Sequence, residues 1–254
     1  MIQIKNQHEI DALKAAGQIV ARTFIEIEPL IKPGAALCDI DQVAEKFIHK
    51  HGAETLYKGI RQLPHQRPFP GVICASVNQQ ICHGIPDKRE LKEGDIVGID
   101  IGLRYKGWCG DMCRTFEIGQ VAPETHRLVE ATREALKKGI AAAMAGNRLG
   151  AIGAAIQAFA ESKGYSVVRE YGGHGIGRNL WEDPFVPHIG PADRGPVLKE
   201  GMILNIEPMI NIGKPDTILM NDQWSVETAD GSLSAQFEDT IVITNNEPQI
   251  LTFI

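Results

Sequence analysis

Four carboxylates and one imidazole stand beside apolar or β-branched runs of the sequence: Asp100, Asp111, Glu207, Glu238 and His174. Taken singly, each acid is explained as well by a surface turn or an ordinary salt bridge. As a set they are not, because several end apolar strands, where a carboxylate needs a cation or a metal as its partner. One ion would be over-supplied with oxygen ligands. The set therefore predicts two divalent cations joined by shared carboxylates, about 3.5–4 Å apart, and Fe²⁺, Mn²⁺, Co²⁺ and Zn²⁺ all suit it.

A predicted hairpin places Asp100 and Asp111 together. The run Val97-Gly-Ile-Asp reads as a buried strand, and the turn Lys106-Gly107 returns the chain to Asp111. This spacing puts both carboxylates on one face of the hairpin. His174 stands between two glycines, where the backbone can approach a ligand closely.

The elements around these residues alternate between helices and strands. Apolar residues at helical spacing predict helices over 6–27, 39–51, 123–145 and 149–163, and β-branched runs predict strands over 72–77 and 96–103. Prolines mark 59–71 as a loop, and the residues from 202 onward read as short strands and turns. This order predicts an α+β or α/β protein.

The chain repeats three of its own patterns in the same order. The spacing from Gly34 to Gly52 recurs from Gly146 to Gly164, Cys82-His-Gly-Ile recurs as Gly173-His-Gly-Ile, and the segment 91–100 recurs at 198–207. Such repeated patterns arise either by chance or by an internal duplication. Three of them in the same order along the chain favour a duplication. We expect a single domain over 1–254 with halves of about 1–120 and 121–254. Asp100 and Glu207 would then lie near the junction of the halves, a usual place for a site.

Composition limits the class of protein. The 254 residues carry 26 basic and 32 acidic side chains, a net charge of −6, with 43% hydrophobic and 23% charged residues. This excludes a disordered, collagen-like or coiled-coil chain, and the mild acidity argues against a nucleic-acid partner. No apolar run approaches the roughly 18 residues of a membrane span, and the N-terminus does not read as a signal peptide. The odd number of cysteines, five, favours free thiols and a cytoplasmic location.

Six motifs together resemble the type I methionine aminopeptidases over nearly the whole chain. They are Cys82-His-Gly-Ile-Pro, Gly94-Asp-Ile-Val-Gly-Ile-Asp, Gly110-Asp, Gly173-His-Gly-Ile-Gly-Arg, Ile206-Glu-Pro and Ser232-Leu-Ser-Ala-Gln-Phe-Glu. The resemblance implies the pita-bread fold, in which two pseudo-twofold halves surround a central curved antiparallel sheet. It also implies that the five residues above are metal ligands, with Asp111 and Glu238 bridging the two ions. Glu207 would in addition accept a proton.

The activity that the resemblance implies is removal of the N-terminal methionine from peptides or nascent proteins. A water activated by two metals would attack the first peptide carbonyl, and His83 would hydrogen-bond the substrate or pass a proton to the leaving amine. The implied wall of the methionine pocket consists of Phe69, Cys74, Leu180 and Trp224, although plain core packing explains each of them equally well. The expected partners are peptide N-termini and, for nascent chains, the ribosome. Neither nucleic acid nor membrane is expected, and the chain is expected to be a monomer.

Three features depart from the family pattern. Trp181 stands seven residues after His174, where a second histidine usually donates to the substrate carbonyl, and Leu180 replaces a usual aromatic. Loss of such a donor costs on the order of 10²–10³ in turnover, although the indole N–H could donate instead and its ring could narrow the substrate entrance. The loop 61–70 is longer than usual, and Asp239 occupies a place where histidine is common. We therefore expect a paralogue with weakened or re-specified activity.

Two other functions share this framework. An Xaa-Pro dipeptidase or creatinase-like hydrolase usually carries a large extra N-terminal domain, whereas here the first helix begins directly after Asn6. A catalytically impaired pseudoenzyme would bind N-terminal peptides without cleaving them. Trp181 favours that reading, and the intact set of five ligands opposes it.

Overall fold

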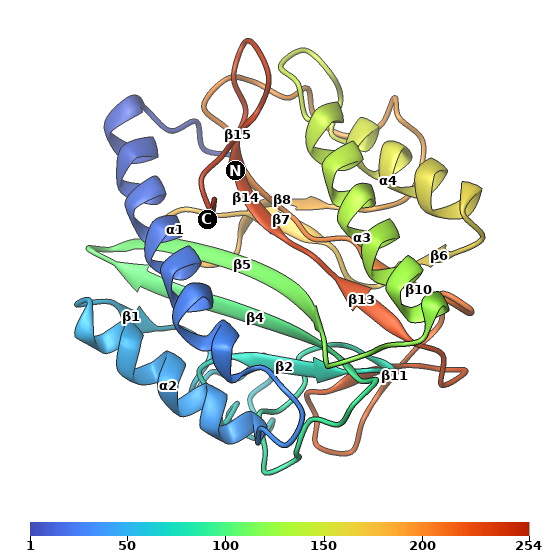
Figure 1. Ribbon diagram of the computed structural model, residues 1–254. Coiled ribbons are helices and arrows are strands. Elements are labelled where there is room, and N and C mark those ends of the chain that lie inside the picture. Colours follow the sequence, from blue (N-terminus) through green and yellow to red (C-terminus); the bar gives the residue numbers. More distant parts are fainter. Residues whose placement is uncertain (254) are drawn as a thin grey trace.

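In the described part of the chain, four α-helices, arranged in two pairs, cover one side of a curved layer of antiparallel strands (Figure 1). The structure, a computed structural model, describes residues 1–253. One pair is α1 (Gln7–Ile27) and α2 (Leu37–Lys50), with the 3₁₀ helix η1 (Glu28–Leu30) between them, and the other is α3 (Pro123–Ala142) and α4 (Gly150–Ser162). The four predicted helices are confirmed, with their ends moved by up to three residues. None of the helices formed by the described residues is long and apolar enough to cross a bilayer.

The strands found within residues 1–253 form four antiparallel sheets. In the first, β4 (Ile96–Tyr105) lies between β1 (Glu54–Thr55), β2 (Cys74–Val77) and β5 (Trp108–Glu117). The second contains, in order, β15 (Gln249–Ile250), β14 (Asp239–Val242), β9 (Ile203–Ile206), β7 (Gly173–Gly175) and β8 (Glu182–Val186). The two smaller sheets are β13 (Ser234–Gln236), β10 (Met209–Asn211) and β6 (Ser166–Val167), and β11 (Thr217–Leu219), β12 (Val226–Thr228) and β3 (Gln80–Cys82). Both predicted strands are present, although the first begins at Cys74 rather than at 72.

Helix α1 shows how the sequence sets an element boundary and buries one face. Its start is a capping box, in which Glu9 N–H donates to Asn6 Oδ1 at 3.1 Å and Asn6 N–H donates to Glu9 Oε2 at 3.0 Å. Phe24, on its apolar face, is buried and stacks on Phe116 of β5 at 6.2 Å between ring centroids. The helix therefore lies against the back of the β4–β5 hairpin (Figure 1).

Two apolar clusters fill the space between helices and strands, one beneath each helix pair. Ile40 of α2 and Ile99 of β4 belong to the first, and Ile156 of α4 and Ile206 of β9 belong to the second. Side chains of a strand alternate between its two faces. Asp100, the neighbour of Ile99, therefore points to the face of the sheet that the helices leave uncovered.

The repeated sequence motifs adopt matching backbone contacts. Before α2, Gly34 N–H donates to Leu91 O at 2.8 Å, and before α4, Gly146 N–H donates to Leu198 O at 3.0 Å. Each bond ties the start of the second helix of a pair to the turn that leads into an acid-bearing strand, β4 or β9. The duplicated pattern thus positions Asp100 and Glu207 in the same way.

The sheets of the two regions meet directly between β5 and β14. Glu238 N–H donates to Cys113 O at 2.9 Å, and the Arg114 guanidinium donates to Glu238 O at 2.5 Å and to Asp239 Oδ1 at 2.6 Å. Asp239 is itself buried and accepts a hydrogen bond from the Thr252 hydroxyl at 2.9 Å. The aspartate that departs from the family pattern therefore pairs with an arginine at the seam where Glu238 is held.

Candidate metal centre

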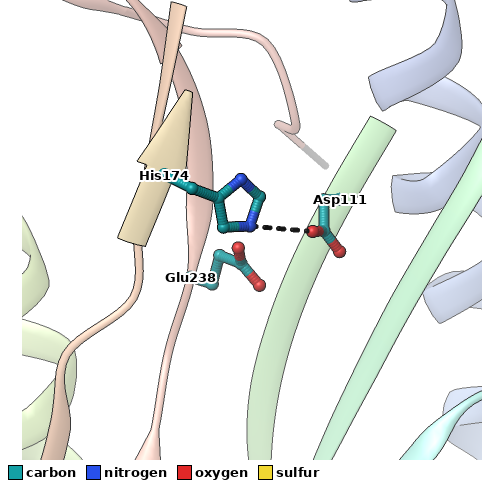
Figure 2. A group of neighbouring side chains, drawn as sticks. All are labelled: Asp111, His174 and Glu238. Carbon is teal, nitrogen blue, oxygen red and sulfur yellow. Dashed lines mark ion pairs between the residues drawn. The ribbon is translucent and has the colours of Figure 1, made fainter. Parts of the chain in front are cut away.

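The five residues predicted as ligands come together around one cavity of about 500 Å³. Asp100 lies in β4, Asp111 in β5, His174 in β7, Glu207 directly after β9, and Glu238 between β13 and β14. Ligand atoms of Asp111, His174 and Glu238 all lie within 4.8 Å of one another (Figure 2). His174 Nε2 is 3.7 Å from Asp111 Oδ2 and 3.7 Å from Glu207 Oε1. Residues from four separate stretches of the chain thus face a common point.

The predicted hairpin is confirmed, and its register explains why two of the acids share a face. Strand β4 pairs with β5 so that Asp100 lies opposite Cys113 and Asp111 lies opposite Gly102. Opposed residues of an antiparallel pair point to the same side, and so do residues two apart in one strand. Both carboxylates therefore face the cavity, while Ile99 packs into the core on the other side.

His174 is held with its Nε2 atom toward the acids. Its Nδ1 lies 2.9 Å from Gly175 O, and because a carbonyl only accepts, Nδ1 carries the proton and Nε2 is free to bind a cation. Burial lowers the pKa of His174 to about 4, so the ring is neutral at pH 7. A Cβ at position 173 would lie 2.0 Å from Asn205 O, so glycine is what lets β7 lie this close to β9.

Burial raises the pKa values of all four acids, and repulsion from neighbouring carboxylates adds to the rise in Asp111, Glu207 and Glu238. Burial raises the pKa of Asp100 to about 6. It also raises the pKa values of Asp111, Glu207 and Glu238 well above their usual range, with the neighbouring carboxylates as the next cause. Among residues 1–253, no lysine or arginine lines the cavity. The acids therefore need cations from outside the chain, and this oxygen-rich set with one neutral imidazole fits divalent first-row metals.

Three polar side chains that sequence analysis missed hold the acids from behind. Gln236 Nε2 donates to Glu207 Oε2 at 3.2 Å, and Asn205 Nδ2 donates to Asp111 Oδ2 at 3.1 Å. The Thr240 hydroxyl lies 2.7 Å from Asn205 Oδ1 and 2.9 Å from Asp111 O. Contacts of this kind orient metal ligands. Asn205 and Gln236 each stand two positions before an acid, Glu207 and Glu238, so strand alternation was a usable signal for both.

Two further residues were missed and had no such signal. The Tyr57 hydroxyl lies 2.6 Å from Asp100 Oδ1, although Tyr57 comes from the segment after β1 and belongs to no motif. His188 Nε2 accepts a hydrogen bond from Glu207 N–H at 3.2 Å, and burial lowers the pKa of His188 to about 3. Both contacts arise only where distant segments pack together.

His83 lines the same cavity but is held by aromatic rings. Its ring lies edge-on to Tyr171 at 5.8 Å and to Trp224 at 6.5 Å. Burial lowers its pKa to about 4, so the imidazole is neutral at pH 7. Its φ of 57° is uncommon for a residue with a side chain, and such conformations cluster at functional sites.

The apolar part of the cavity contains three of the four predicted wall residues. Phe69, Cys74 and Trp224 are almost fully buried and line the cavity, and Phe69 packs edge-on against Trp224 at 5.2 Å. Leu180 is buried in the same apolar cluster but does not line the cavity. It packs behind the wall because its side chain turns into the core while that of its neighbour, Trp181, turns outward.

Trp181 borders the mouth of the cavity. It lines the cavity and is 52% exposed. Phe185 also lines the cavity and is 55% exposed. The loop 61–70 lies against another part of the wall: Trp224 Nε1 donates to Arg67 O at 2.7 Å, and Gln66 Nε2 donates to Gln223 O at 2.6 Å. The loop thereby holds the indole of Trp224 in place.

Comparison with known proteins identifies the family. The chain matches the model of metallopeptidase family M24 over residues 11–245. It is 45% identical over 254 residues to a methionine aminopeptidase of Clostridium perfringens, covering 100% of both chains. The crystal structure of methionine aminopeptidase from Rickettsia prowazekii matches with a TM-score of 0.95 at 42% identity, again over 100% of both chains. An Xaa-Pro dipeptidase from Bacillus anthracis is less similar, with a TM-score of 0.77 at 25% identity over 99% of this chain and 62% of that one. The chain therefore belongs to metallopeptidase family M24 and, within it, to the methionine aminopeptidases.

Proposed function

We propose that this chain hydrolyses the first peptide bond of peptides and nascent proteins, releasing their N-terminal methionine, at a centre that holds two divalent cations. The observation that carries the proposal is the convergence of Asp111, His174 and Glu238 within 4.8 Å of one another, with Asp100 and Glu207 lining the same cavity beside an apolar wall. Full-length similarity to methionine aminopeptidases supports the same activity. The shorter overlap with the Xaa-Pro dipeptidase makes that alternative the weaker one.

The residues that would hold the cations are Asp100, Asp111, His174, Glu207 and Glu238, with Asp111 and Glu238 shared between them. Bound cations supply the positive charge that activates a water at neutral pH and retains the α-amine of the substrate. Asp111 shares the Tyr57 hydroxyl with Asp100 through Oδ1, and its Oδ2 lies 3.7 Å from His174 Nε2, which supports Asp111 as a shared ligand.

Proton transfer falls to Glu207 and His83. The Gln236 amide fixes one oxygen of Glu207, and the other lies near His174. Glu207 therefore has one oxygen held by a neutral amide and one turned toward the centre, where it can accept a proton. His83, which lines the same cavity, is neutral and donates to the substrate amide or passes a proton to the leaving amine.

Phe69, Cys74 and Trp224 form the surface on which the methionine side chain of the substrate packs. A thioether makes favourable contacts with aromatic rings, and Phe69 and Trp224 present two of them. Leu180 supports this surface from behind. The same apolar wall excludes bulk water from the buried acids.

Trp181 re-specifies or weakens the activity by narrowing the mouth of the cavity. Trp181→His should raise kcat on a Met-Ala-type peptide by up to about 10²-fold, because a donor for the developing oxyanion is restored. Trp181→Phe, which removes the indole N–H and adds no donor, is the control. No gain in kcat for Trp181→His would show that Trp181 does not limit the chemistry.

We further propose that the enzyme works in the cytoplasm as a monomer, on free peptide N-termini and on nascent chains at the ribosome, with no nucleic acid or membrane as a partner. Its five cysteines are free thiols, which supports a reducing compartment. The donor set suits Fe²⁺, Mn²⁺, Co²⁺ or Zn²⁺, and cellular availability decides among them. Light scattering of the purified chain tests the monomer.

The experiment that tests the function is release of free methionine from Met-Ala-Ser by the metal-stripped chain after addition of Co²⁺ or Mn²⁺. Release should depend on the metal, stop with a chelator, and be lost in Glu207→Gln. Glu26→Gln, which alters an exposed acid on α1, should behave like the unaltered chain. Cleavage of Xaa-Pro dipeptides instead would favour the dipeptidase, and peptide binding without release would favour the pseudoenzyme.

A further inference from the structure

Tyr57 places a hydroxyl group between two of the acids. Its side chain is buried, and Oη lies 2.6 Å from Asp100 Oδ1 and 2.7 Å from Asp111 Oδ1. Within residues 1–253, this hydroxyl is the one side-chain group within hydrogen-bond distance of both acids of the hairpin, and its single proton is donated to one Oδ1 at a time. Apart from the neighbouring Asp111, no other described side chain hydrogen-bonds to the Asp100 carboxylate. The contact joins residues 43 and 54 positions apart in the chain.

The hairpin contains a gap that fits the tyrosine ring. Gly102 lies opposite Asp111 and two residues after Asp100, on the same face of the sheet. A Cβ at Gly102 would lie 2.8 Å from Tyr57 Cε1 and 2.9 Å from both Cζ and Oη. The ring therefore rests on the strand between the two carboxylates, in space that any other residue at position 102 would fill.

The segment that carries Tyr57 is fixed on both sides. Strand β1 ends next to it with Thr55 opposite Leu103, and Leu56 N–H donates to Gly102 O at 3.2 Å. On the other side, Phe69 packs edge-on to the ring of Tyr57 at 6.4 Å. The hydroxyl is therefore held at the acids by the backbone as well as by the ring.

We propose that Tyr57 is a positioning residue of the metal centre, which holds Asp100 and Asp111 through their Oδ1 atoms; this rests on the metal centre of the proposed function. The other oxygen of Asp111, Oδ2, is the one that lies 3.7 Å from His174 Nε2. The hydroxyl thus turns Asp111 so that Oδ2 faces the remaining ligands, and it is the contact that orients Asp100. Ligating carboxylates need such outer hydrogen bonds, and the loss of one typically costs 10–100-fold in metal affinity.

The test is Tyr57→Phe, which keeps the ring on Gly102 and removes the hydroxyl alone. The metal-stripped full chain is titrated with Mn²⁺ by calorimetry, and its absorption is recorded after loading with Co²⁺. We expect Mn²⁺ affinity to fall by about 10–100-fold and the visible Co²⁺ bands to shift, because the carboxylates around the metal lose their fixed orientation. Tyr171→Phe removes another hydroxyl from the same cavity and should leave Mn²⁺ affinity unchanged.

A second variant reaches the same contact from the other side. Gly102→Ala keeps the hydroxyl in the chain but displaces the ring, so Mn²⁺ affinity should again fall, with circular dichroism confirming the fold. An affinity for Mn²⁺ in Tyr57→Phe that is unchanged or higher would overturn the inference, as would failure of the unaltered chain to bind Mn²⁺. If Tyr57→Phe weakens Mn²⁺ binding but the unaltered chain releases no methionine, the inference holds and the proposed function fails.

Discussion

The first and second halves of the chain contain similar turns but bring different side chains to the cavity. The turn before β4 ends at Gly94 with a φ of 89°, and the turn before β9 ends at Gly201 with a φ of 83°. The first half then provides two carboxylates from within one hairpin, whereas the second provides an imidazole and two carboxylates from three separate strands or strand ends. Repetition of the backbone therefore sets where side chains stand, while the residue at each position sets what they do.

The difference between the two halves of the chain is clearest at His83 and His174, the two histidines of the repeated motif. Burial lowers the pKa to about 4 for His83 as well as for His174, so both are neutral at pH 7. His174 lies in strand β7 and faces the acids, whereas His83 has a left-handed backbone and packs against Tyr171 and Trp224. The two occurrences of one sequence motif thus present their imidazoles to different surroundings, His174 to the acids and His83 to aromatic rings, because their backbones aim the rings differently.

The largest expected difference between the two histidines appears when each is replaced separately. His174→Ala is expected to weaken Mn²⁺ binding by more than about 100-fold, since a direct ligand is lost and even outer contacts cost 10–100-fold. His83→Ala should leave Mn²⁺ affinity unchanged and lower kcat by about 10²–10⁴. Calorimetry and steady-state kinetics on the same two variants distinguish the roles, and equal losses of Mn²⁺ affinity would contradict them.

The matching glycine turns offer a second comparison, of stability instead of chemistry. Gly94→Ala should lower the free energy of unfolding by about 1–2 kcal/mol, because alanine is strained in the left-handed region. Gly201→Ala should cost about 1–3 kcal/mol more, since its Cβ would lie 2.6 Å from Lys5 O, whereas the nearest atom at Gly94 is 3.8 Å away. Denaturant unfolding of both variants measures the difference. Equal losses would mean that the N-terminal segment moves aside without cost.

The smallest expected effect concerns pH and His83. Its folded pKa of about 4 lies below its ordinary value of 6.5, so the folded chain binds fewer protons than the unfolded chain between these values. Below pH 6.5 protonation of His83 therefore favours the unfolded chain. The contribution of His83 to the free energy of unfolding is full above pH 6.5 and falls as the pH decreases toward 4. The metal-free protein should lose free energy of unfolding between pH 8 and pH 6. His83→Gln should make that loss smaller by about 1 kcal/mol. If the free energy of unfolding falls by the same amount in both proteins between pH 8 and pH 6, His83 does not contribute to the pH dependence of stability.

Much of the site could be predicted from local patterns. Asp100 and Asp111 were placed on one face because the strand, the turn and the return are contiguous in the chain, and the register of β4 and β5 confirms it. The start of α1 at Gln7 is likewise local, because Asn6 and Glu9, three residues apart, form its capping box. The repeats also pointed to the relation between Asp100 and Glu207, because turns and strand ends are set by short stretches of sequence.

The sequence by itself determined which residues have the chemistry of a metal centre and that one hairpin carries Asp100 and Asp111. Only the tertiary structure decided which neighbours hold those residues and which wall faces the substrate. Tyr57 reaches Asp100 because a glycine in a distant strand leaves room for its ring, and Leu180 lies behind the wall while Trp181 is exposed at the mouth. The physical reason is that these contacts depend on how segments far apart in the chain pack against each other, and local patterns carry no record of that packing.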